Sequence, residues 1–395
     1  MSPNPPPESA PATPIRILDI INLSTSAQTL LRNRVLAMRA RGMDNRIMCM
    51  PGPYVQALRD AGIPTVAVDM PRAINPFWMV VAVLQMMTYI RREKIDLVHT
   101  HCSMPGILGR LAARLAGVPA IVHTIHGYHL HDRIAPVLAS AYTRAEKFVG
   151  GFTDLMLSQN RTDLEVVRRG GFVPDDRLHL IGNGIDLRRF RPVARAREPN
   201  APVTLLCVAR LEPVKNHPML FEAVRRAAAS GRKLRLWLVG DGELRSDYEK
   251  RCAEMGLAGV VEFLGYRDDV ERLLAQTDIA VLTSVKEGIP RAMLEAMAMK
   301  VPVVATRVVG TEETVADGET GYLVGLGDVE AMAERLTRLI DDRALRERMG
   351  ERGRAWVEAH FDEDAIVDSL VGAYRQLVAR GRAKGAIAWV PATRP

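Results

Sequence analysis

The stretch that decides the fold is VTLLCVARLEPVKNH, residues 203–217. Its first seven residues are almost all apolar, and a short apolar run of this length predicts a buried strand. A polar loop follows, and residues 218–230 then carry the apolar spacing of a helix. A strand that leads through a short loop into a helix is the unit from which parallel α/β sheets are built.

The same alternation continues on both sides of this stretch. Toward the N-terminus, strands are predicted at 15–21, 46–50, 65–69, 96–99, 120–125 and 154–158, and helices at 29–41, 77–93 and 107–116. Toward the C-terminus, strands are predicted at 235–240, 260–264, 278–282 and 301–305, and helices at 244–255, 291–299, 329–341, 345–359 and 364–380. Repeated strand–helix units favour an α/β fold with two doubly wound parallel sheets, in which ligands bind at the carboxyl ends of the strands.

The alternation breaks at 183–202, where Pro192, Pro199 and Pro202 predict a linker. A chain of 395 residues is long enough for two or three domains. We therefore expect a disordered proline-rich leader at 1–14, a Rossmann-like domain at 15–190, a linker at 191–202, a second Rossmann-like domain at 203–361, a C-terminal helix at 362–380 and a basic flexible tail at 381–395.

The composition is that of a globular protein, with 48% hydrophobic and 25% charged residues. The four cysteines lie far apart and form no C-x-x-C pair, which argues against a disulfide framework or a cysteine zinc site and favours a reducing compartment. The uncharged stretch 73–90 is shorter than the about 20 apolar residues of a membrane span. It favours a buried helix, and a helix lying in a membrane interface is the alternative.

Positive charge is concentrated in the first half of the chain. Residues 1–195 have 24 basic and 15 acidic side chains, a net charge of +9, whereas residues 196–395 have 29 and 31, a net charge of −2. This asymmetry indicates an anionic partner for the first half, such as a phosphate, a membrane surface or nucleic acid. Nucleic acid is the least supported of these, because only 5% of residues are aromatic and no recognition module is present.

Two cations flank the loop that follows the strand at 203–209. Arg210 comes at the end of the strand, and Lys215 stands just before the next helix. Together with the helix N-terminus they would neutralise a phosphate or diphosphate, although two solvated surface cations are the alternative. After the next strand, Gly240 and Gly242 form a turn that lets a backbone approach a ligand or simply reverses the chain.

Two carboxylates stand eight positions apart after the strand at 278–282. Glu287 falls in the loop and Glu295 in the following helix, while Pro290 suits the first helical position and leaves nearby N–H groups as donors. One carboxylate would bind the hydroxyls of a sugar and the other those of a ribose. From spacing alone, a glutamate favoured by the helix dipole and a second surface glutamate are equally supported.

Histidines cluster in the first half, where six of the nine lie between 99 and 131. They form two groups, one at 99–101 and one at 123–131. Both groups follow the ends of predicted strands, so several of these side chains can point into one cleft. A metal site is disfavoured, because no compact H-x-x-x-H spacing or carboxylate triad is present.

In combination, these motifs resemble the glycosyltransferase family 4 enzymes, which have the GT-B fold of two Rossmann-like domains. The matching motifs, in order, are NGID at 183–186, the arginine–lysine loop at 210–215, the glycine turn at 240–243, FLGY at 263–266, the E-x7-E element at 287–295 and DGETGYL at 317–323. The resemblance implies an acceptor-binding first domain, a donor-binding second domain and a last helix that crosses back to the first. It also implies retaining, metal-independent sugar transfer from a nucleotide-sugar substrate without a cofactor.

The resemblance also assigns roles to individual residues. The expected catalytic residues are His126, Arg210, Lys215 and Glu287, of which Arg210 and Lys215 would hold the donor diphosphate and Glu287 the donor sugar. The expected donor-binding residues are Gly240, Gly242, Gly265, Tyr266, Arg267, Gly288, Ile289, Pro290, Arg291 and Glu295. His101 and His129 are expected to face the acceptor or to support the cleft.

One loop departs from the family pattern. The family has a glycine pair in the first strand–helix loop, whereas this chain has Ser24, Thr25, Ser26 and Ala27. Serine hydroxyls and backbone amides can replace the contact, so Ser26 and Ala27 are the positions expected to face a phosphate or the acceptor.

The run from His126 to Tyr128 resembles the branch of the family that extends lipid-linked surface polysaccharides. Together with the basic first half, this favours a UDP-sugar donor, a polyprenyl-diphosphate-linked glycan acceptor and a cytoplasmic protein at the anionic inner face of the cell membrane. The alternatives are transfer to a small soluble acceptor and a nucleotide-sugar epimerase of similar fold.

Overall fold

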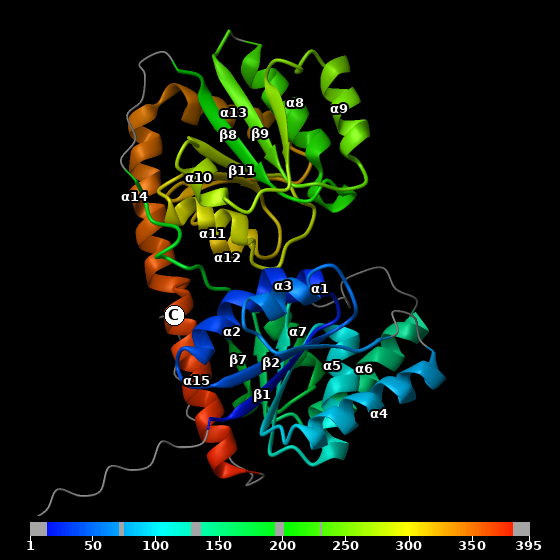
Figure 1. Cartoon of the computed structure of the whole chain (residues 1–395). Helices are drawn as coiled ribbons and strands as arrows, with labels where there is room; N and C mark the ends of the chain where they lie inside the picture. The colour runs from blue at the N-terminus through cyan, green and yellow to red at the C-terminus, as the bar shows by residue number, and fades with distance from the viewer. Residues whose placement is uncertain (1–13, 71–74, 128–135, 194–200, 230, 382–395) are drawn as a thin grey trace, which may run out of the picture. The chain divides into compact units, whose positions relative to one another are not determined.

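The computed structural model describes residues 14–70, 75–127, 136–193, 201–229 and 231–381 (Figure 1). The expected leader apart from Pro14, the expected tail apart from Gly381, and residues 194–200 of the expected linker lie outside this part of the chain. The chain separates into two compact units. The first contains residues up to Ser158, Leu164–His179 and residues from Val367 onward, and the second contains Gln159–Asp163 and Leu180–Ile366.

The first unit is built on a seven-stranded sheet with the order β3-β2-β1-β4-β5-β6-β7. Its strands are β1 (Arg16–Ile20), β2 (Asp44–Cys49), β3 (Thr65–Ala67), β4 (Leu97–His101), β5 (Ala120–Ile125), β6 (Leu155–Ser158) and β7 (Leu178–Leu180). Its helices are α1 (Ser24–Ser26), the π-helix η1 (Ala27–Leu31), α2 (Arg32–Arg39), α3 (Val55–Asp60), α4 (Pro76–Arg92), α5 (Ser103–Ala116), α6 (Pro136–Gly150), α7 (Arg161–Gly170) and the short 3₁₀ helix η3 (Asp175–Arg177).

The second unit is built on a six-stranded sheet with the order β10-β9-β8-β11-β12-β13. Its strands are β8 (Val203–Val208), β9 (Leu234–Val239), β10 (Val261–Gly265), β11 (Ile279–Leu282), β12 (Val303–Thr306) and β13 (Gly321–Val324). Its helices are the short 3₁₀ helix η4 (Pro213–Lys215), α8 (His217–Ala228), α9 (Arg245–Glu254), α10 (Val270–Leu274), α11 (Arg291–Ala298), α12 (Thr311–Thr314), α13 (Val329–Asp341) and α14 (Arg343–His360). The last helix, α15 (Glu363–Arg380), begins in this unit and continues into the first.

The expected α/β fold with two doubly wound parallel sheets is confirmed. The strand pairs β1·β2, β1·β4, β8·β9 and β8·β11 are all parallel. In each sheet the strand order reverses once, between β1 and β4 in the first unit and between β8 and β11 in the second. Such switch points leave room for a ligand at the carboxyl ends of the two central strands. The sequence analysis missed β7 and β13, which are only three and four residues long.

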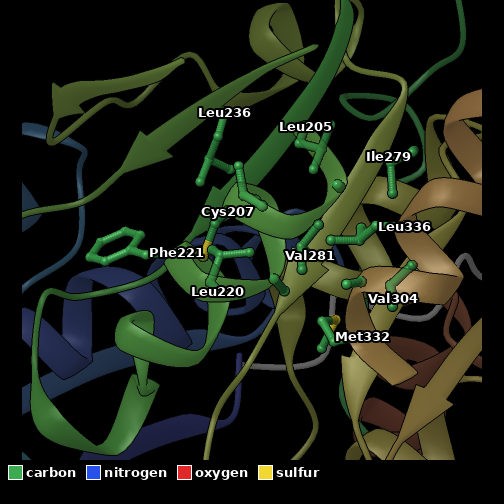
Figure 2. Packing of buried hydrophobic residues seen from close by; sticks show 14 of the residues in the cluster. Leu205, Cys207, Leu220, Phe221, Leu236, Ile279, Val281, Val304, Met332 and Leu336 are labelled. Carbon is green, nitrogen blue, oxygen red and sulfur yellow. The ribbon is translucent and has the colours of Figure 1, made fainter. Parts of the chain in front are cut away.

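Both faces of the second sheet are covered by helices, which is why its strands are apolar along their whole length. On one face, Leu205 and Cys207 of β8 and Val281 of β11 pack with residues of α8, α9 and α13 (Figure 2). On the other face, the neighbouring Leu206 and Leu282 pack with residues of α10 and α11. This alternation fixes the register of each strand, because a shift by one residue would exchange its two faces.

Helix α4, expected as a buried helix at 77–93, is buried along one face only. Ala82, Val83, Met86 and Ile90 lie in the core of the first unit. Apolar side chains of its first turns point outward instead, with exposed fractions of 67% for Phe77, 56% for Trp78, 59% for Val80 and 50% for Leu84. No helix among the described residues is both long enough and apolar enough to cross a membrane.

Candidate functional site

The sequence motifs of the second unit lie at the carboxyl ends of neighbouring strands. The arginine–lysine loop follows β8, the glycine turn follows β9, and the E-x7-E element follows β11. Since β8 and β11 are the two strands at the switch point, the arginine–lysine loop and the E-x7-E element flank the position where a ligand binds in this class of sheet.

Lys215 and Glu287 form an ion pair at this switch point. The Lys215 Nζ lies 2.6 Å from Glu287 Oε1, and the two side chains are only 19% and 11% exposed. Ser284 donates a hydrogen bond to the same Glu287 oxygen. Burial raises the pKa of the nearby Cys207 thiol to about 12. To a smaller extent, the charge of Lys215 lowers this pKa and the charge of Glu287 raises it. The ion pair is therefore supported by one further side chain, that of Ser284, which follows β11.

Backbone contacts fix the two loops against each other. The Thr283 hydroxyl donates to the carbonyls of Lys215 and Asn216, at 3.1 and 3.0 Å. The Val285 amide donates to the Val214 carbonyl at 2.8 Å. Asn216 has φ +47°, a left-handed conformation that asparagine tolerates and that redirects the chain from η4 into α8. These bonds set the position of Lys215 relative to Glu287 through the main chain.

Two further segments pack against the Glu287 loop. The Asn183 side chain, from the NGID motif, donates to the Ile289 carbonyl at 3.2 Å. Gly310, which precedes α12, has φ +85°, and a Cβ atom there would lie 1.3 Å from the Gly288 carbonyl oxygen. The loop can take this path only because residue 310 is a glycine.

The glycine turn packs closely against the arginine–lysine loop. A Cβ atom on Gly240 would lie 2.1 Å from the Ala209 carbonyl oxygen, and one on Gly242 would lie 2.5 Å from that of Leu211. The Gly240 amide donates to the Gly265 carbonyl at 2.8 Å. These two glycines therefore allow close packing between the two loops, a role that was not predicted from the sequence, and the hydrogen bond of Gly240 brings residue 265 next to the turn.

Three other expected donor residues lie on the surface. Arg210 is 71% exposed and pairs with Glu212, with 2.6 Å between Nη1 and Oε1, and the structure gives no contact between it and Lys215 or Glu287. Tyr266 is 63% exposed. Arg267 is also exposed and pairs with Asp269 at 2.7 Å.

Helix α11 carries the second carboxylate of the E-x7-E element. It begins at Arg291, the start predicted from the sequence, and Pro290 is the residue before the helix although its type also suits the first helical position. Ile289 and Pro290 are buried. The Arg291 Nε lies 3.9 Å from Glu295 Oε1, and burial raises the pKa of the Glu295 carboxyl. The structure thus pairs Glu295 with Arg291 and not with the Lys215–Glu287 pair.

In the first unit, two histidines of β4 contact one acid of β1. His101 Nε2 lies 3.3 Å and His99 Nδ1 lies 3.5 Å from Asp19 Oδ1. His126, after β5, reaches the other ring nitrogen of His101, with 2.9 Å between His126 Nε2 and His101 Nδ1. The sequence analysis did not identify Asp19 as a candidate site residue, because a single acidic residue within an apolar predicted strand indicates no particular function.

The first strand–helix loop of this unit, expected at residues 24–27, is helical in the structure. Ser26 ends α1, and Ala27 begins the π-helix η1. Ala27 is fully buried, and its amide donates to the Leu23 carbonyl at 2.9 Å, so this N–H is used inside the helix. Ser26 is partly exposed. His129 lies outside the described residues.

Among the described residues, one group of acid and imidazole side chains is compact enough to hold a metal ion. It comprises Asp19, His99 and His101, whose nearest ligand atoms lie within 4.8 Å of one another. These atoms are already hydrogen-bonded: Asn45 donates to Asp19 at 2.9 Å, and His99 Nδ1 lies 2.6 Å from the Tyr374 hydroxyl. The arrangement is therefore explained as a buried polar network. The cysteines are free thiols.

The sequence matches two protein-family models. Residues 27–184 match the glycosyl transferase 4-like domain, and residues 191–356 match glycosyl transferases group 1. The chain is 30% identical over 315 residues to the UDP-Gal:α-D-GlcNAc-diphosphoundecaprenol α-1,3-galactosyltransferase of Escherichia coli, which covers 76% of this chain and 81% of that protein.

Two further proteins are similar over most of the chain. The N,N'-diacetylbacillosaminyl-diphospho-undecaprenol α-1,3-N-acetylgalactosaminyltransferase of Campylobacter jejuni is 24% identical over 366 residues, or 87% of this chain and 94% of that protein. The crystal structure of HepE from Anabaena in complex with UDP and glucose superimposes with a TM-score of 0.77 at 20% identity, covering 92% of this chain and 100% of that one.

Proposed function

This chain belongs to the family 4-like glycosyltransferases with the GT-B fold, and we propose that it transfers a sugar, with retention of configuration, from a UDP-sugar to a polyprenyl-diphosphate-linked glycan. The observation that carries the donor half of this proposal is the Lys215–Glu287 pair at the switch point of the second sheet. The UDP in the HepE structure supports the choice of nucleotide. The two relatives, whose names specify diphospho-undecaprenol acceptors, support the choice of acceptor.

The geometry of the pair suits the departure of a nucleoside diphosphate. As the bond to the sugar breaks, negative charge develops on the leaving phosphate oxygen, and a fixed cation stabilises that charge better than water does. Lys215 is fixed in advance by Glu287 and by the hydrogen bonds of its loop, so little reorganisation is needed when the donor binds. Arg210, on the exposed rim, adds a second positive charge for the diphosphate. A divalent metal is then not needed for this charge.

Glu287 would act on the sugar. Its carboxylate is oriented by Ser284 and Lys215, and the oxygens of an ionised carboxylate accept hydrogen bonds from sugar hydroxyls. Glu295 would bind the ribose, and the backbone at 265–267 would line the base. In this assignment the second unit binds the donor and the first unit binds the acceptor.

With a lipid-linked acceptor, we also propose that the enzyme works at the anionic inner face of the cell membrane. Helix α4 supplies a suitable surface, because it has no acidic residue and exposes Phe77, Trp78, Val80 and Leu84 from its first turns, followed by Arg91 and Arg92 at its end. The rings of Phe77 and Trp78 pack edge to face, with 5.3 Å between their centroids. Helices that lie in a membrane interface expose aromatic and aliphatic side chains and also carry basic residues.

A direct assay tests the proposal. The purified protein is incubated with radiolabelled UDP-sugars together with an undecaprenyl-diphosphate-linked saccharide or a short-chain analogue, in the presence of EDTA. A parallel incubation omits the acceptor. We expect label to pass to the lipid-linked product with retained configuration. Three outcomes would contradict the proposal. Transfer to a soluble acceptor only would exclude the lipid-linked acceptor, and release of an epimerised nucleotide sugar without acceptor would indicate an epimerase. Strict dependence on added metal would exclude metal-independent transfer.

A further inference from the structure

Helices α4, α5 and α6 form one layer on the sheet of the first unit (Figure 1). They connect β3 to β4, β4 to β5 and β5 to β6, and all three connections run in the same direction across the sheet. Because such connections between parallel strands are right-handed, the three helices cover the same face. Helix α5 packs against both of its neighbours: Arg91 of α4 donates to the Leu115 carbonyl at 2.7 Å, and Arg110 of α5 pairs with Glu146 of α6. We call the outer surface of this layer the three-helix face.

Exposed apolar side chains of the first unit gather on the three-helix face. Within the part of the unit that the structure describes, every large apolar side chain that is exposed belongs to α4, α5 or α6. Besides the four of α4, these are Leu115 at the end of α5 and Val137 and Phe148 of α6, with exposed fractions of 50%, 82% and 67%. The Phe148 ring packs edge to face on Phe152, with 5.7 Å between their centroids. Apolar side chains that gather on one surface indicate an interaction site.

The exposed charges on these three helices are all positive. Helices α4 and α5 contain no acidic residue, and α6 contains one, Glu146. The acid that directly follows α4, Glu93, is paired with Arg46 and with one arginine of α4. The exposed basic side chains are Arg91 and Arg92 of α4, Arg114 of α5, and Arg144 and Lys147 of α6. The three-helix face therefore combines apolar side chains with cations.

The one acid of α6 is withdrawn from this surface by an ion pair inside the layer. Glu146 is 1% exposed and Arg110 is 0% exposed, with 2.7 Å between Glu146 Oε2 and Arg110 Nη2. The Tyr142 hydroxyl donates to the second oxygen of Glu146 at 3.1 Å. A buried charge is tolerated when it is paired and hydrogen-bonded, as both are here. The pair is neutral, so the charge that the layer presents to the outside is the charge of its exposed cations.

We propose that the whole three-helix face, and not α4 alone, docks on an anionic lipid surface. Lipid headgroups supply the negative charge that the exposed cations lack, and the acyl region takes up Leu115, Val137 and Phe148 together with the apolar side chains of α4. A second copy of the chain fits less well, because in a two-fold symmetric interface this face would meet itself and the cations of the two copies would repel each other.

Contacts from three helices have a consequence that a single helix cannot give. A unit that rests on α4 alone can roll about the axis of that helix, whereas a unit that also rests on α5 and α6 has one orientation on the lipid surface. The inference rests on the proposed function for its link to a lipid-linked acceptor, but docking itself is a property that can be measured without catalysis.

The test uses the full-length protein and vesicle flotation, with vesicles of phosphatidylcholine and phosphatidylglycerol or of phosphatidylcholine alone. We expect Phe148→Ser to weaken binding to the anionic vesicles by about 10-fold, as for the loss of one inserted apolar side chain. The double variant Arg144→Gln/Lys147→Gln should weaken it by about 30-fold at low salt and should leave binding to the neutral vesicles unchanged. Because both substituted side chains of the double variant are exposed, it tests the proposal even if Phe148→Ser lowers the melting temperature.

Matched controls come from the second unit. Leu326→Ser removes an exposed apolar side chain, and Lys250→Gln/Arg251→Gln removes two exposed cations of α9, so neither should change vesicle binding. The proposal is overturned if the folded α6 variants bind anionic vesicles like the wild type, if the wild type binds neither kind of vesicle, or if the wild type is a dimer that the α6 variants dissociate. If docking is as expected but no sugar is transferred to a lipid-linked acceptor, the proposed function fails and this inference stands.

Discussion

Lys215 and Glu287 lie 72 positions apart in the chain, and yet 2.6 Å separates the Lys215 Nζ from Glu287 Oε1. The two loops are also joined by hydrogen bonds from the Thr283 hydroxyl and the Val285 amide to main-chain carbonyls, and these bonds do not involve the two charged side chains. This relationship yields a set of expectations that separate the chemical role of the pair from its structural role.

Removing either charge should reduce activity much more than it reduces stability. We expect Lys215→Ala and Glu287→Gln each to lower kcat/KM for the nucleotide sugar by about 100- to 1000-fold, as for the loss of one group that stabilises a developing charge. Steady-state kinetics of the transfer assay measure this. Lys250→Ala, at a side chain that is 79% exposed and belongs to none of the motifs, is the control and should keep full activity. Wild-type kinetics for both variants would refute the site assignment.

The Glu287 loop should depend on Gly310 for steric reasons. Gly310 and Gly318 both have positive φ, +85° and +79°, but a Cβ atom at 310 would overlap the Gly288 carbonyl whereas one at 318 would meet open space. Gly318→Ala should therefore lower the free energy of unfolding by only about 1–2 kcal/mol, the cost of the left-handed conformation. Gly310→Ala should lower it by about 3 kcal/mol or more, because the loop must also move. Urea unfolding of the two variants compares them, and equal losses would count against the clash.

Stability should fall as the pH is lowered from 7 to 5. Burial, helped by the charge of Lys215, lowers the pKa of His217 from 6.5 to about 4 in the folded protein. Between these two values the unfolded chain binds a proton that the folded protein does not, so the stability is present above pH 6.5 and is lost as the pH falls toward 4. His217 alone should account for about 2 kcal/mol of the loss between pH 7 and pH 5.

The buried His99, His101 and His123, whose pKa values are also lowered, act in the same direction. Urea unfolding at both pH values, in the wild type and in His217→Asn, isolates the part due to His217. The pH dependence of the variant should be visibly weaker, and an unchanged dependence would show that His217 is not the group responsible.

The exposed face of α4 should control membrane binding. Burial of a large apolar side chain contributes about 1.5–3 kcal/mol, so Phe77→Ser and Trp78→Ser should each weaken binding to vesicles that contain anionic lipid by at least about 10-fold. Flotation with anionic and with neutral vesicles measures this, and added salt should weaken only the electrostatic part. Leu326→Ser, at an apolar residue of the second unit that is 49% exposed, should leave binding unchanged. Equal binding of all variants would exclude α4 as the docking surface.

The sequence predicted the parallel sheets well because strands that are covered on both faces are apolar throughout. The strands at 203–209 and 278–282 were found within one residue of β8 and β11, and the loops after them were correctly placed at strand ends. Strands β7 and β13 were missed because neither is an uninterrupted apolar run: β7 has His179 at its centre and β13 begins with Gly321.

The supports of the site could not be predicted, because they depend on contacts between segments distant in the sequence. Ser284 and Gly310 act through the Glu287 loop, and Asp19 acts through the parallel register that aligns it with His99. A polar pair, Thr283 and Ser284, directly after an apolar strand was a visible signal that was not used. Helix α11 begins at Arg291, the residue at which the sequence predicted its start, and Pro290 stands one position before it.

The loops around Lys215 and Glu287 are held almost entirely by main-chain atoms, glycines and buried hydroxyls. The Val285 side chain, at the surface of the Glu287 loop, is exposed, and this residue joins the framework through its main-chain amide. We therefore expect substitutions at this position to leave the loops that carry the chemistry folded. The architecture separates the part of the site that must stay constant from the part that can be varied, and we expect residue 285 to be a natural position for a library that seeks new donor specificity.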